Sequence, residues 1–222
     1  MQRFFDVVFT FLALLVLSPL VIPIVIILRF SGEGEIFYKQ NRVGINGESF
    51  GLLKFATMLK NSPNLGTGNM TVKNDPRILP LGNFLRKTKI NELPQLLNIL
   101  LGDMSIIGPR PLTQDHFYEY LPIVQETISS VRPGLSGLGS IIFRDEEEML
   151  HQHTDSKHFY KENISPYKGS LEAWYVKNNG LFTYFMLIAL TGWVVIFPKS
   201  KVVWKVFPFL PPPPAALEKY FL

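Results

Sequence analysis

The sequence contains no cysteine and few charged residues for its length. Among 222 residues there is no Cys, and Asp, Glu, Lys and Arg together make up 18%. The absence of cysteine excludes disulfides, zinc–thiolate sites and catalysis by a thiol. Charged residues form about a quarter of a typical soluble domain, and the deficit here falls at the two ends of the chain. That distribution indicates contact with lipid rather than one large hydrophobic core.

Two binding patterns are also missing. No run of Lys and Arg is interleaved with aromatic residues, so nucleic acid is not an expected partner. Neither a Walker motif nor a dinucleotide-binding glycine motif is present. The formal net charge is only +4. A modest basic excess beside apolar segments favours anionic lipid headgroups or phosphorylated substrates.

Residues 7–28 are almost entirely apolar and are long enough to cross a hydrocarbon core of about 30 Å as a helix. No small-residue cleavage site follows, so we do not expect removal as a signal. Ser18-Pro19 and Pro23 predict a sharp kink in the middle. Basic residues flank both sides, so the positive-inside rule gives no orientation. We favour a re-entrant membrane helix at 1–30, broken at Ser18-Pro19, with a single spanning helix as the alternative.

Residues 31–180 are predicted to form a polar domain of short elements. Residues 36–38 and 50–55 are typical of short strands, and residues 44–47 of the turn between them. Residues 61–70 form a loop rich in Gly, Asn and Pro. The strongest helical pattern lies at 91–102, where leucines recur at 93, 96, 97, 100 and 101.

The start of that predicted helix combines residues that suit phosphate chemistry. Asn91 is a favourable N-cap, Pro94 is tolerated in the first turn, and Gly102 is a natural stop. A helix N-terminus attracts phosphate, and a carboxylate such as that of Glu92 can hold Mg²⁺ beside it. The alternative is that Asn91 is only a cap and Glu92 only a first-turn residue that complements the helix dipole. Several cations also sit beside rigid turns: Lys54, Arg77 after Pro76, Arg110 between two prolines, and Arg132 before Pro133.

Together these segments resemble a known family. RKTKINELPQLLNILLGDMSIIGPRP (86–111) is similar to the signature of the bacterial sugar transferases, the monotopic polyprenyl-phosphate phosphoglycosyl transferases. The same order continues through Ser18-Pro19, Lys54, Asp75-Pro76-Arg77, RPGLSGLG (132–139) and LEAWYVKN (171–178). The resemblance covers residues 1 to about 180.

The resemblance implies an α/β fold: a small mixed cytoplasmic domain, an N-terminal re-entrant membrane helix and amphipathic helices at the membrane interface. It implies transfer of a sugar 1-phosphate from a UDP-sugar to undecaprenyl phosphate, with Mg²⁺ and release of UMP, to initiate surface glycan assembly. The expected location is the cytoplasmic face of the bacterial inner membrane. Expected partners are the UDP-sugar, the polyprenyl phosphate and membrane lipids, with a homodimer left open.

The resemblance also implies roles for particular residues. An Asp-Glu pair opens the leucine-rich helix in the family, and the Asp attacks the sugar-linked phosphate. Those positions are occupied here by Asn91 and Glu92, which become the candidate catalytic and Mg²⁺-binding residues. The candidate substrate-binding residues are Lys54, Arg77, Arg86, Arg110 and Arg132.

Asn91 departs from the family pattern. An amide is a poor nucleophile and a weaker Mg²⁺ ligand than a carboxylate. Three explanations remain open: a branch in which Glu92 or the lipid phosphate attacks, a catalytically silent scaffold of the same fold, or a form altered to stop turnover. Because Glu92, Arg86 and GPRP (108–111) are intact, we favour a functional branch. Ala56 also stands where the family commonly has arginine.

Residues 181–222 are predicted to be an apolar helix followed by a tail. Residues 181–197 are at the short limit for a membrane span, and Trp193 and the lysines after it favour an interfacial helix. A second span is the alternative. The four prolines at 211–214 indicate a stiff polyproline II tail. His151, His153, Asp155 and His158 have ligand-like side chains, but we interpret them as a solvated charged loop.

Overall fold

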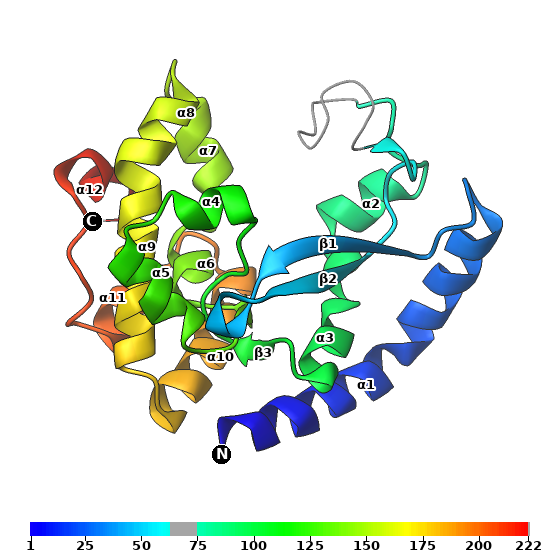
Figure 1. Ribbon diagram of the computed structural model, residues 1–222, viewed down its shortest axis with the longest axis horizontal. Coiled ribbons are helices and arrows are strands. Elements are labelled where there is room, and N and C mark those ends of the chain that lie inside the picture. Colours follow the sequence, from blue (N-terminus) through cyan, green and yellow to red (C-terminus); the bar gives the residue numbers. More distant parts are fainter. Residues whose placement is uncertain (63–74, 222) are drawn as a thin grey trace. The chain divides into compact units, whose positions relative to one another are not determined.

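The computed structural model describes residues 1–62 and 75–221 and contains helices with short strands (Figure 1). Within these residues the strands form two two-stranded sheets, β1 with β2 and β3 with β4, and β3 and β4 run parallel. The expected mixture of helix and strand is therefore present. The predicted loop at 61–70 lies mostly outside the described residues. The strands are β1 Phe37–Val43, β2 Ser49–Phe55, β3 Ser105–Ile107 and β4 Gly134–Ser136.

Helices make up most of the described chain. The α-helices are α1 Gln2–Phe30, α2 Gly82–Lys87, α3 Gln95–Leu101, α4 Gln114–Tyr118, α5 Pro122–Ser129, α6 Leu138–Ile142, α7 Glu146–His151, α8 Ser156–Phe159, α9 Ser165–Lys177, α10 Leu181–Ile196, α11 Val202–Val206 and α12 Ala215–Phe221. Short 3₁₀ turns occur at Ile45–Gly47 and Ile90–Glu92, and a π-helical turn occurs at Tyr160–Ile164.

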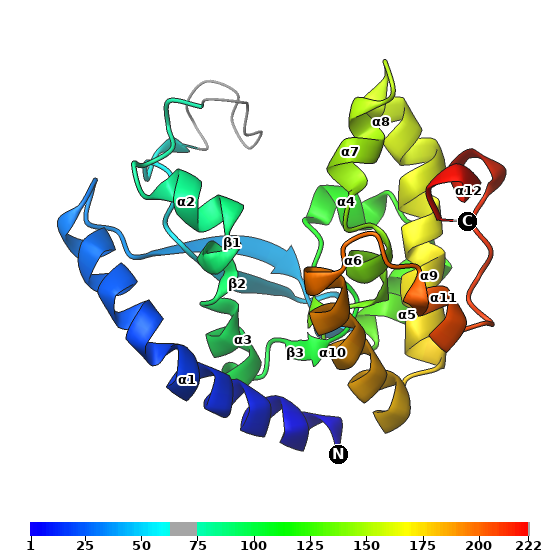
Figure 2. The same ribbon diagram turned by 180° about the vertical axis from the view of Figure 1, so that it is seen from behind.

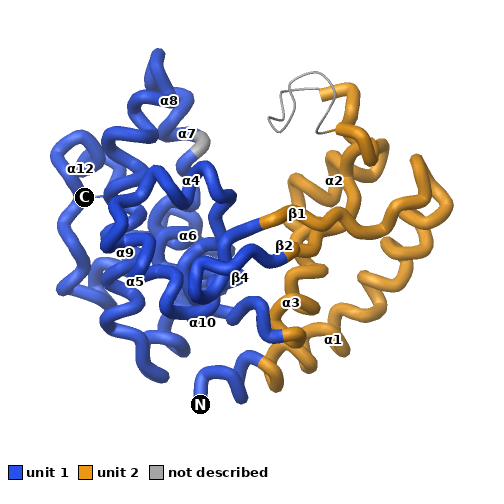
Figure 3. The backbone as a smooth tube through the Cα atoms, viewed as in Figure 1, with its two compact units in different colours: residues 1–6, 42–50, 102–222 blue, residues 7–41, 51–101 orange. Residues whose placement is uncertain are grey.

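The chain divides into two compact units that cut across the three predicted segments (Figure 3). Unit 1 contains residues 1–6, 42–50 and 102–222, and unit 2 contains residues 7–41 and 51–101. Each unit is therefore assembled from stretches distant in sequence. The first five residues of α1, residues 2–6, belong to unit 1, although the rest of that helix belongs to unit 2.

Helix α1 is continuous from Gln2 to Phe30 and passes through Pro19 and Pro23 without interruption. It is visibly curved in both views (Figures 1 and 2), as prolines inside a helix require. The Ser18 hydroxyl donates to the carbonyl of Leu15 at 2.8 Å, within the same turn. The helix is long and apolar enough to cross a membrane, and only 11% of its most apolar stretch is buried. The surface that remains is apolar and suits lipid.

The hairpin of β1 and β2 matches the strands expected from sequence. Consecutive strands joined by so short a turn run antiparallel. The turn at Ile45–Gly47 places Asn46 at φ 58° and Gly47 at φ +75°, a conformation that Asn and Gly adopt most easily. In unit 2, Phe55 of β2 packs with Ile24 and Leu28 of α1 and with Leu85 of α2. The end of the apolar helix is thereby attached to the unit that carries Asn91 and Glu92.

Unit 1 holds the start of α1 through a buried carboxylate. Asp6 is 2% exposed, and its Oδ1 accepts hydrogen bonds from the Ser105 hydroxyl, the Ile106 amide and the Tyr184 hydroxyl at 2.8–3.0 Å. A buried carboxylate with several donors is much less costly than an isolated one. Asp6 therefore ties the first turns of α1 to β3 and α10.

Helix α10 presents two different faces. Its buried residues include Tyr184, Leu187 and Leu190, which face unit 1, where α10 packs on α6 and β3. Phe182, Val195 and Ile196 are more than 60% exposed. The helix has sixteen residues, short of the usual length of a span. This one-sided burial is the pattern expected of an interfacial helix.

One C-terminal prediction is wrong, and the contacts of the tail could not be read from the sequence. The segment with His151 and His158 is helical, in α7 and α8, because the Asp155 side chain accepts the His158 amide and caps α8. The tail after the prolines is not free, because Tyr167 donates to the Pro211 carbonyl at 2.8 Å and Leu217 of α12 is fully buried. Apolar residues spaced after the proline run give the tail a face that unit 1 buries.

Candidate functional site

Asn91 and Glu92 lie in a 3₁₀ turn, four residues before the helix that they were expected to open. Lys89 adopts a left-handed conformation, Ile90–Glu92 form the turn, and α3 begins only at Gln95. The backbone hydrogen bonds here join residues three apart, as in a 3₁₀ helix: the Leu93 amide donates to the Ile90 carbonyl at 3.1 Å and the Leu96 amide to the Leu93 carbonyl at 3.0 Å. The prediction that Asn91 caps α3 is therefore wrong. Gly102, at φ +100°, does end the helix as expected.

The Asn91 side chain is unusual within unit 2. Its Oδ1 is buried and has no hydrogen-bond partner among the described residues. Most buried polar atoms are satisfied, so an orphaned acceptor is a candidate ligand atom. The adjacent Glu92 is half-buried. The pair thus offers one unengaged oxygen and one carboxylate at neighbouring positions.

Lys54 and Arg86 also belong to unit 2 and are half-buried. Lys54 lies on β2, whose backbone is held by a residue that the sequence did not single out. Asn98 of α3 is 1% exposed; its Oδ1 accepts the Leu53 amide and its Nδ2 donates to the Gly51 carbonyl, both at 2.9 Å. The predicted leucine face is partly wrong, because Leu101 is 75% exposed while Asn98 is buried. A buried asparagine such as Asn98 does not follow the apolar periodicity of a helix, so the sequence pattern could not identify it.

Arg77 is not placed as a substrate ligand would be. It is 5% exposed; its Nε and Nη2 donate to Asp75 at 2.9 and 2.6 Å, and its Nη1 donates to the Ser62 carbonyl at 2.7 Å. The carboxylate beside it raises the pKa of the guanidinium above its usual value. Since its donors are engaged inside unit 2, we assign Arg77 a structural role and omit it from the substrate-binding residues proposed below.

Arg110 and Arg132 belong to unit 1, on two loops whose backbones meet at β3 and β4. The Gly108 amide donates to the Ser136 carbonyl at 3.0 Å, and the Gly134 amide donates to the Pro109 carbonyl at 2.8 Å. A Cβ on Gly134 would lie 2.1 Å from the Gly108 nitrogen, so glycine is required for this approach. The glycines of both motifs therefore fix the two arginine loops against each other.

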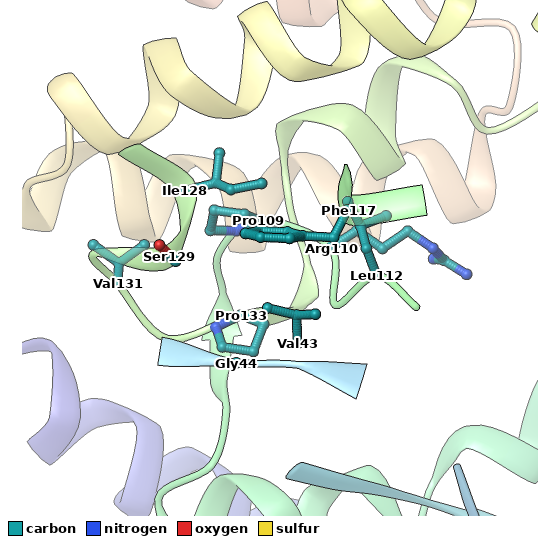
Figure 4. A pocket seen from close by; sticks show the side chains of 10 residues that line it. All are labelled: Val43, Gly44, Pro109, Arg110, Leu112, Phe117, Ile128, Ser129, Val131 and Pro133. Carbon is teal, nitrogen blue, oxygen red and sulfur yellow. The ribbon is translucent and has the colours of Figure 1, made fainter. Parts of the chain in front are cut away.

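The Arg110 side chain is exposed, whereas the loop behind it is packed. A shallow pocket beside the loop is mostly apolar, with Pro109, Leu112, Phe117 and Ile128 among its lining residues. Figure 4 shows that the guanidinium of Arg110 points away from these side chains. Arg132 is also exposed, and its Nε donates to the Gly102 carbonyl at 2.7 Å. Each of these two arginines therefore has a backbone held by the fold and an exposed side chain.

Glu172, like Asn98, was not identified as a candidate from the sequence, although it lies in the LEAWYVKN motif. It is 4% exposed on α9, and its Oε1 accepts the Arg110 backbone amide at 3.4 Å. Burial raises the pKa of this carboxyl to about 7, against the opposing effect of the Arg110 and Gly139 backbone amides and of Lys168. An acidic residue in a sequence motif predicts no particular partner. Its contact with Arg110 appears only in the fold.

Asn91 and Glu92 fit a magnesium ion that shares its coordination with substrate. Among residues 1–62 and 75–221, no group of three or more Asp, Glu or His side chains forms a metal site. Mg²⁺, however, usually takes one or two protein oxygens and completes its shell with phosphates and water. The unpartnered Asn91 Oδ1 beside the Glu92 carboxylate provides such a pair.

Comparison with known proteins places this arrangement in context. The sequence model described as bacterial sugar transferase matches residues 1–198. The exopolysaccharide production protein ExoY of Sinorhizobium fredii is 39% identical over 159 residues, which cover 65% of this chain and 70% of ExoY. The undecaprenyl-phosphate galactose phosphotransferase of Salmonella typhimurium is 31% identical over 210 residues, covering 88% of this chain and 40% of that protein.

A third relative extends the comparison. The UDP-glucose:undecaprenyl-phosphate glucose-1-phosphate transferase of Escherichia coli is 34% identical over 167 residues, covering 74% of this chain and 36% of that protein. The chain therefore corresponds to most of ExoY but to less than half of the two named transferases. Residues 199–222, which include α11, α12 and the proline run, lie beyond the family match.

Proposed function

The chain belongs to the bacterial sugar transferase family and is a transferase of the phosphoglycosyl type, and from this premise we propose its reaction. It transfers a sugar 1-phosphate from a UDP-sugar to undecaprenyl phosphate and releases UMP. Relatives named for glucose and galactose transfer make UDP-glucose and UDP-galactose the first substrates to test. The product, a lipid-linked sugar diphosphate, would initiate assembly of a surface glycan.

The proposed reaction exchanges one phosphoanhydride bond for another. The bond between the β-phosphorus of the UDP-sugar and its bridging oxygen breaks, and that oxygen leaves with UMP. A lipid phosphate oxygen ends on the same β-phosphorus. The lipid phosphate attacks this phosphorus directly, or the Glu92 carboxylate attacks first and forms an acyl phosphate as UMP leaves. In the second route a lipid phosphate oxygen then attacks the same phosphorus, and the bond to Glu92 breaks to regenerate the carboxylate. Both routes balance without any further reactant.

The observation that carries this proposal is the unpartnered oxygen of Asn91 beside Glu92. The Asn91 amide cannot act as the nucleophile, so its Oδ1 is assigned to holding a cation or a phosphate-bound water. When bound, Mg²⁺ supplies positive charge that offsets the charge of the substrate phosphates. Glu92 is the one carboxylate in this turn and is assigned either the covalent role or that of second ligand.

The cationic residues receive binding roles. Arg110 and Arg132, with accessible guanidinium groups on fixed loops, are proposed to contact phosphate oxygens, and Lys54 and Arg86 to balance charge near Asn91. We propose that α1 bends further at Pro19 and Pro23 in the membrane, so that its exposed apolar surface enters and returns to the same side, and that α10 lies at the interface.

The test is UMP release by the full chain in a membrane mimetic with undecaprenyl phosphate, Mg²⁺ and a panel of UDP-sugars. We expect UMP from at least one sugar, with a matching lipid-linked product and loss of both on chelation. No UMP from any sugar, with no product after Asn91→Asp, would contradict the proposal. Radiolabelled sugar phosphate retained on the protein, and lost in Glu92→Gln, would identify the covalent route.

Asn91 also supports a second candidate, a catalytically silent membrane scaffold that binds the UDP-sugar. The favouring observation is the amide at the position where the family has a nucleophilic carboxylate. The two candidates differ in one measurement. The scaffold binds UDP-sugar without UMP release, and Asn91→Asp creates turnover. The enzyme releases UMP before any substitution.

A further inference from the structure

Glu172 connects the two arginine loops of unit 1 from behind. It lies on α9 at 4% exposure. Its Oε1 accepts the Arg110 backbone amide at 3.4 Å, and Gly139 lies directly against the same carboxyl. One buried side chain therefore hydrogen-bonds the GPRP loop and packs against the end of the RPGLSGLG loop.

The glycines of the second loop make room for this carboxyl. A Cβ on Gly139 would lie 2.5 Å from Glu172 Oε1, which is too close for any side chain. A Cβ on Gly137 would lie 2.2 Å from the Gly108 carbonyl oxygen and 3.8 Å from Glu172 Oε2. The glycine spacing of this motif is thus explained by the approach of Glu172 and of the GPRP backbone.

The contact is made by the backbone of Arg110 and not by its side chain. The guanidinium is exposed and points away from the packed side of the loop (Figure 4). The Glu172 Oε2 is buried and has no hydrogen-bond partner among the described residues. A buried carboxyl with one unsatisfied oxygen is costly, so a purely structural origin would favour a better-satisfied or apolar side chain at this position.

We propose that Glu172 is a positioning residue: it holds the Arg110 loop in the conformation that presents the guanidinium to a substrate phosphate. This inference rests on the proposed function, because it assigns Arg110 a phosphate. Glu172 touches neither the substrate nor the reacting atoms in this scheme. Its effect is transmitted through the backbone of residue 110.

Ionisation of Glu172 provides a readout that a merely structural residue would not. The groups that interact with it are Lys168 and Tyr175 on α9, Arg110 on the loop and Tyr120 after α4. Lys168 is itself paired with Glu146 of α7. The ionised carboxyl accepts the Arg110 amide more strongly than the neutral one. Since burial raises the pKa of Glu172 to about 7, Arg110-dependent activity should rise with pH through the neutral range.

The first test is a double-mutant cycle on UMP release. Glu172→Leu leaves the Arg110 amide unsatisfied, and we expect kcat/KM to fall about tenfold, mainly through KM for the UDP-sugar. In an Arg110→Ala background the same change should cost less than about twofold, because the guanidinium it positions is gone. Tyr167→Phe is the matched control: it removes one hydrogen bond of a buried residue on the same helix, facing Pro211. Its effect should be equal in both backgrounds. Equal effects of Glu172→Leu in both backgrounds would overturn the inference.

The second test uses Glu172→Gln, which keeps the acceptor oxygen and the shape of the side chain. We expect activity within about threefold of the unsubstituted protein, with the neutral-range rise in the pH profile abolished. An unchanged pH profile would contradict the inference. This variant also keeps the test decisive if Glu172→Leu does not fold.

A third measurement separates this inference from the proposed function. Hydrogen exchange of the backbone amides at residues 106–112 requires no substrate. We expect about tenfold faster exchange in Glu172→Leu and little change in Glu172→Gln or Tyr167→Phe. If exchange is faster in Glu172→Leu but the unsubstituted chain releases no UMP, then Glu172 does hold this loop and the proposed function is wrong. If exchange is unchanged in Glu172→Leu and the unsubstituted chain releases UMP, then the proposed function stands and the role of Glu172 is wrong.

Discussion

Arg77 and Arg110 each follow a proline, and the fold uses these two arginines in opposite ways. In the Asp75-Pro76-Arg77 segment the guanidinium is buried and bound by Asp75 and the Ser62 carbonyl. In the GPRP segment the guanidinium of Arg110 is exposed, and its backbone amide is bound by Glu172. The difference lies in which part of the arginine the protein satisfies. An arginine with a satisfied side chain supports the fold, and one with a satisfied backbone is available to a ligand.

The comparison is tested most severely by removing the buried guanidinium. Arg77→Ala leaves the Asp75 carboxylate buried without its partner, and breaking a buried ion pair in this way costs about 3–5 kcal/mol. We expect a large fall in thermal midpoint, measured in detergent, and near-normal UMP release per folded molecule. Loss of UMP release with an unchanged midpoint would show that Arg77 binds substrate. The double variant Asp75→Leu with Arg77→Met should recover part of the stability, because neither partner is left charged.

The second prediction concerns the exposed arginine. Arg110→Ala should reduce kcat/KM about 100-fold, equivalent to about 2.7 kcal/mol, because a guanidinium contact to phosphate is lost. The thermal midpoint should change by less than about 2 °C, since the side chain is exposed. Arg110→Lys should recover only part of the activity, because lysine lacks the bidentate geometry. A fall in stability similar to that of Arg77→Ala would remove the distinction between the two segments.

Asn98 sharpens the comparison, because it is a second buried side chain that holds the backbone beside a functional cation. Its amide bridges the Leu53 nitrogen and the Gly51 oxygen of β2, immediately before Lys54. Asn98→Ala should cost about 1–3 kcal/mol, since two buried backbone groups lose their partner. Asn98→Leu, which fills the volume without the hydrogen bonds, should be no better. A midpoint within 1 °C of the unsubstituted protein would show that solvent replaces the amide.

Much of this fold was predictable from local patterns. The apolar helix, the hairpin around residues 44–47 and the stop at Gly102 follow from composition, turn residues and a glycine at positive φ. The family was also identified correctly from the order of its motifs. These features depend on residues close together in sequence, where propensity and periodicity carry information.

The remaining features depend on contacts between distant residues. Asp75, two residues before Arg77, is a local hint, but the burial of Arg77 also depends on the distant Ser62 carbonyl, and the support of Arg110 depends on the distant Glu172. Helix α3 begins later than predicted because the residues after Lys89 form a 3₁₀ turn, although asparagine is a residue type that often caps helices. Buried polar residues such as Asn98 and Glu172 follow no hydrophobic pattern, so their roles emerge only from the partners that they satisfy.

The smallest expected effect tests Glu172 through stability alone. Burial raises the pKa of its carboxyl from 4.5 to about 7, so between these values the folded chain holds a proton that the unfolded chain has lost. This group therefore favours folding most below pH 4.5, and its contribution falls as the pH rises to about 7 and is constant above that. Glu172→Gln cannot ionise. The thermal midpoint of the Gln variant minus that of the unsubstituted protein should increase between pH 5 and pH 8, by at least about 2 °C, the shift that about 1 kcal/mol produces in a chain of this size. Other titrating groups contribute equally to both proteins and cancel in the difference. A difference that stays constant or decreases would mean that Glu172 is already ionised at pH 5 and that its carboxylate binds the Arg110 loop at every pH tested.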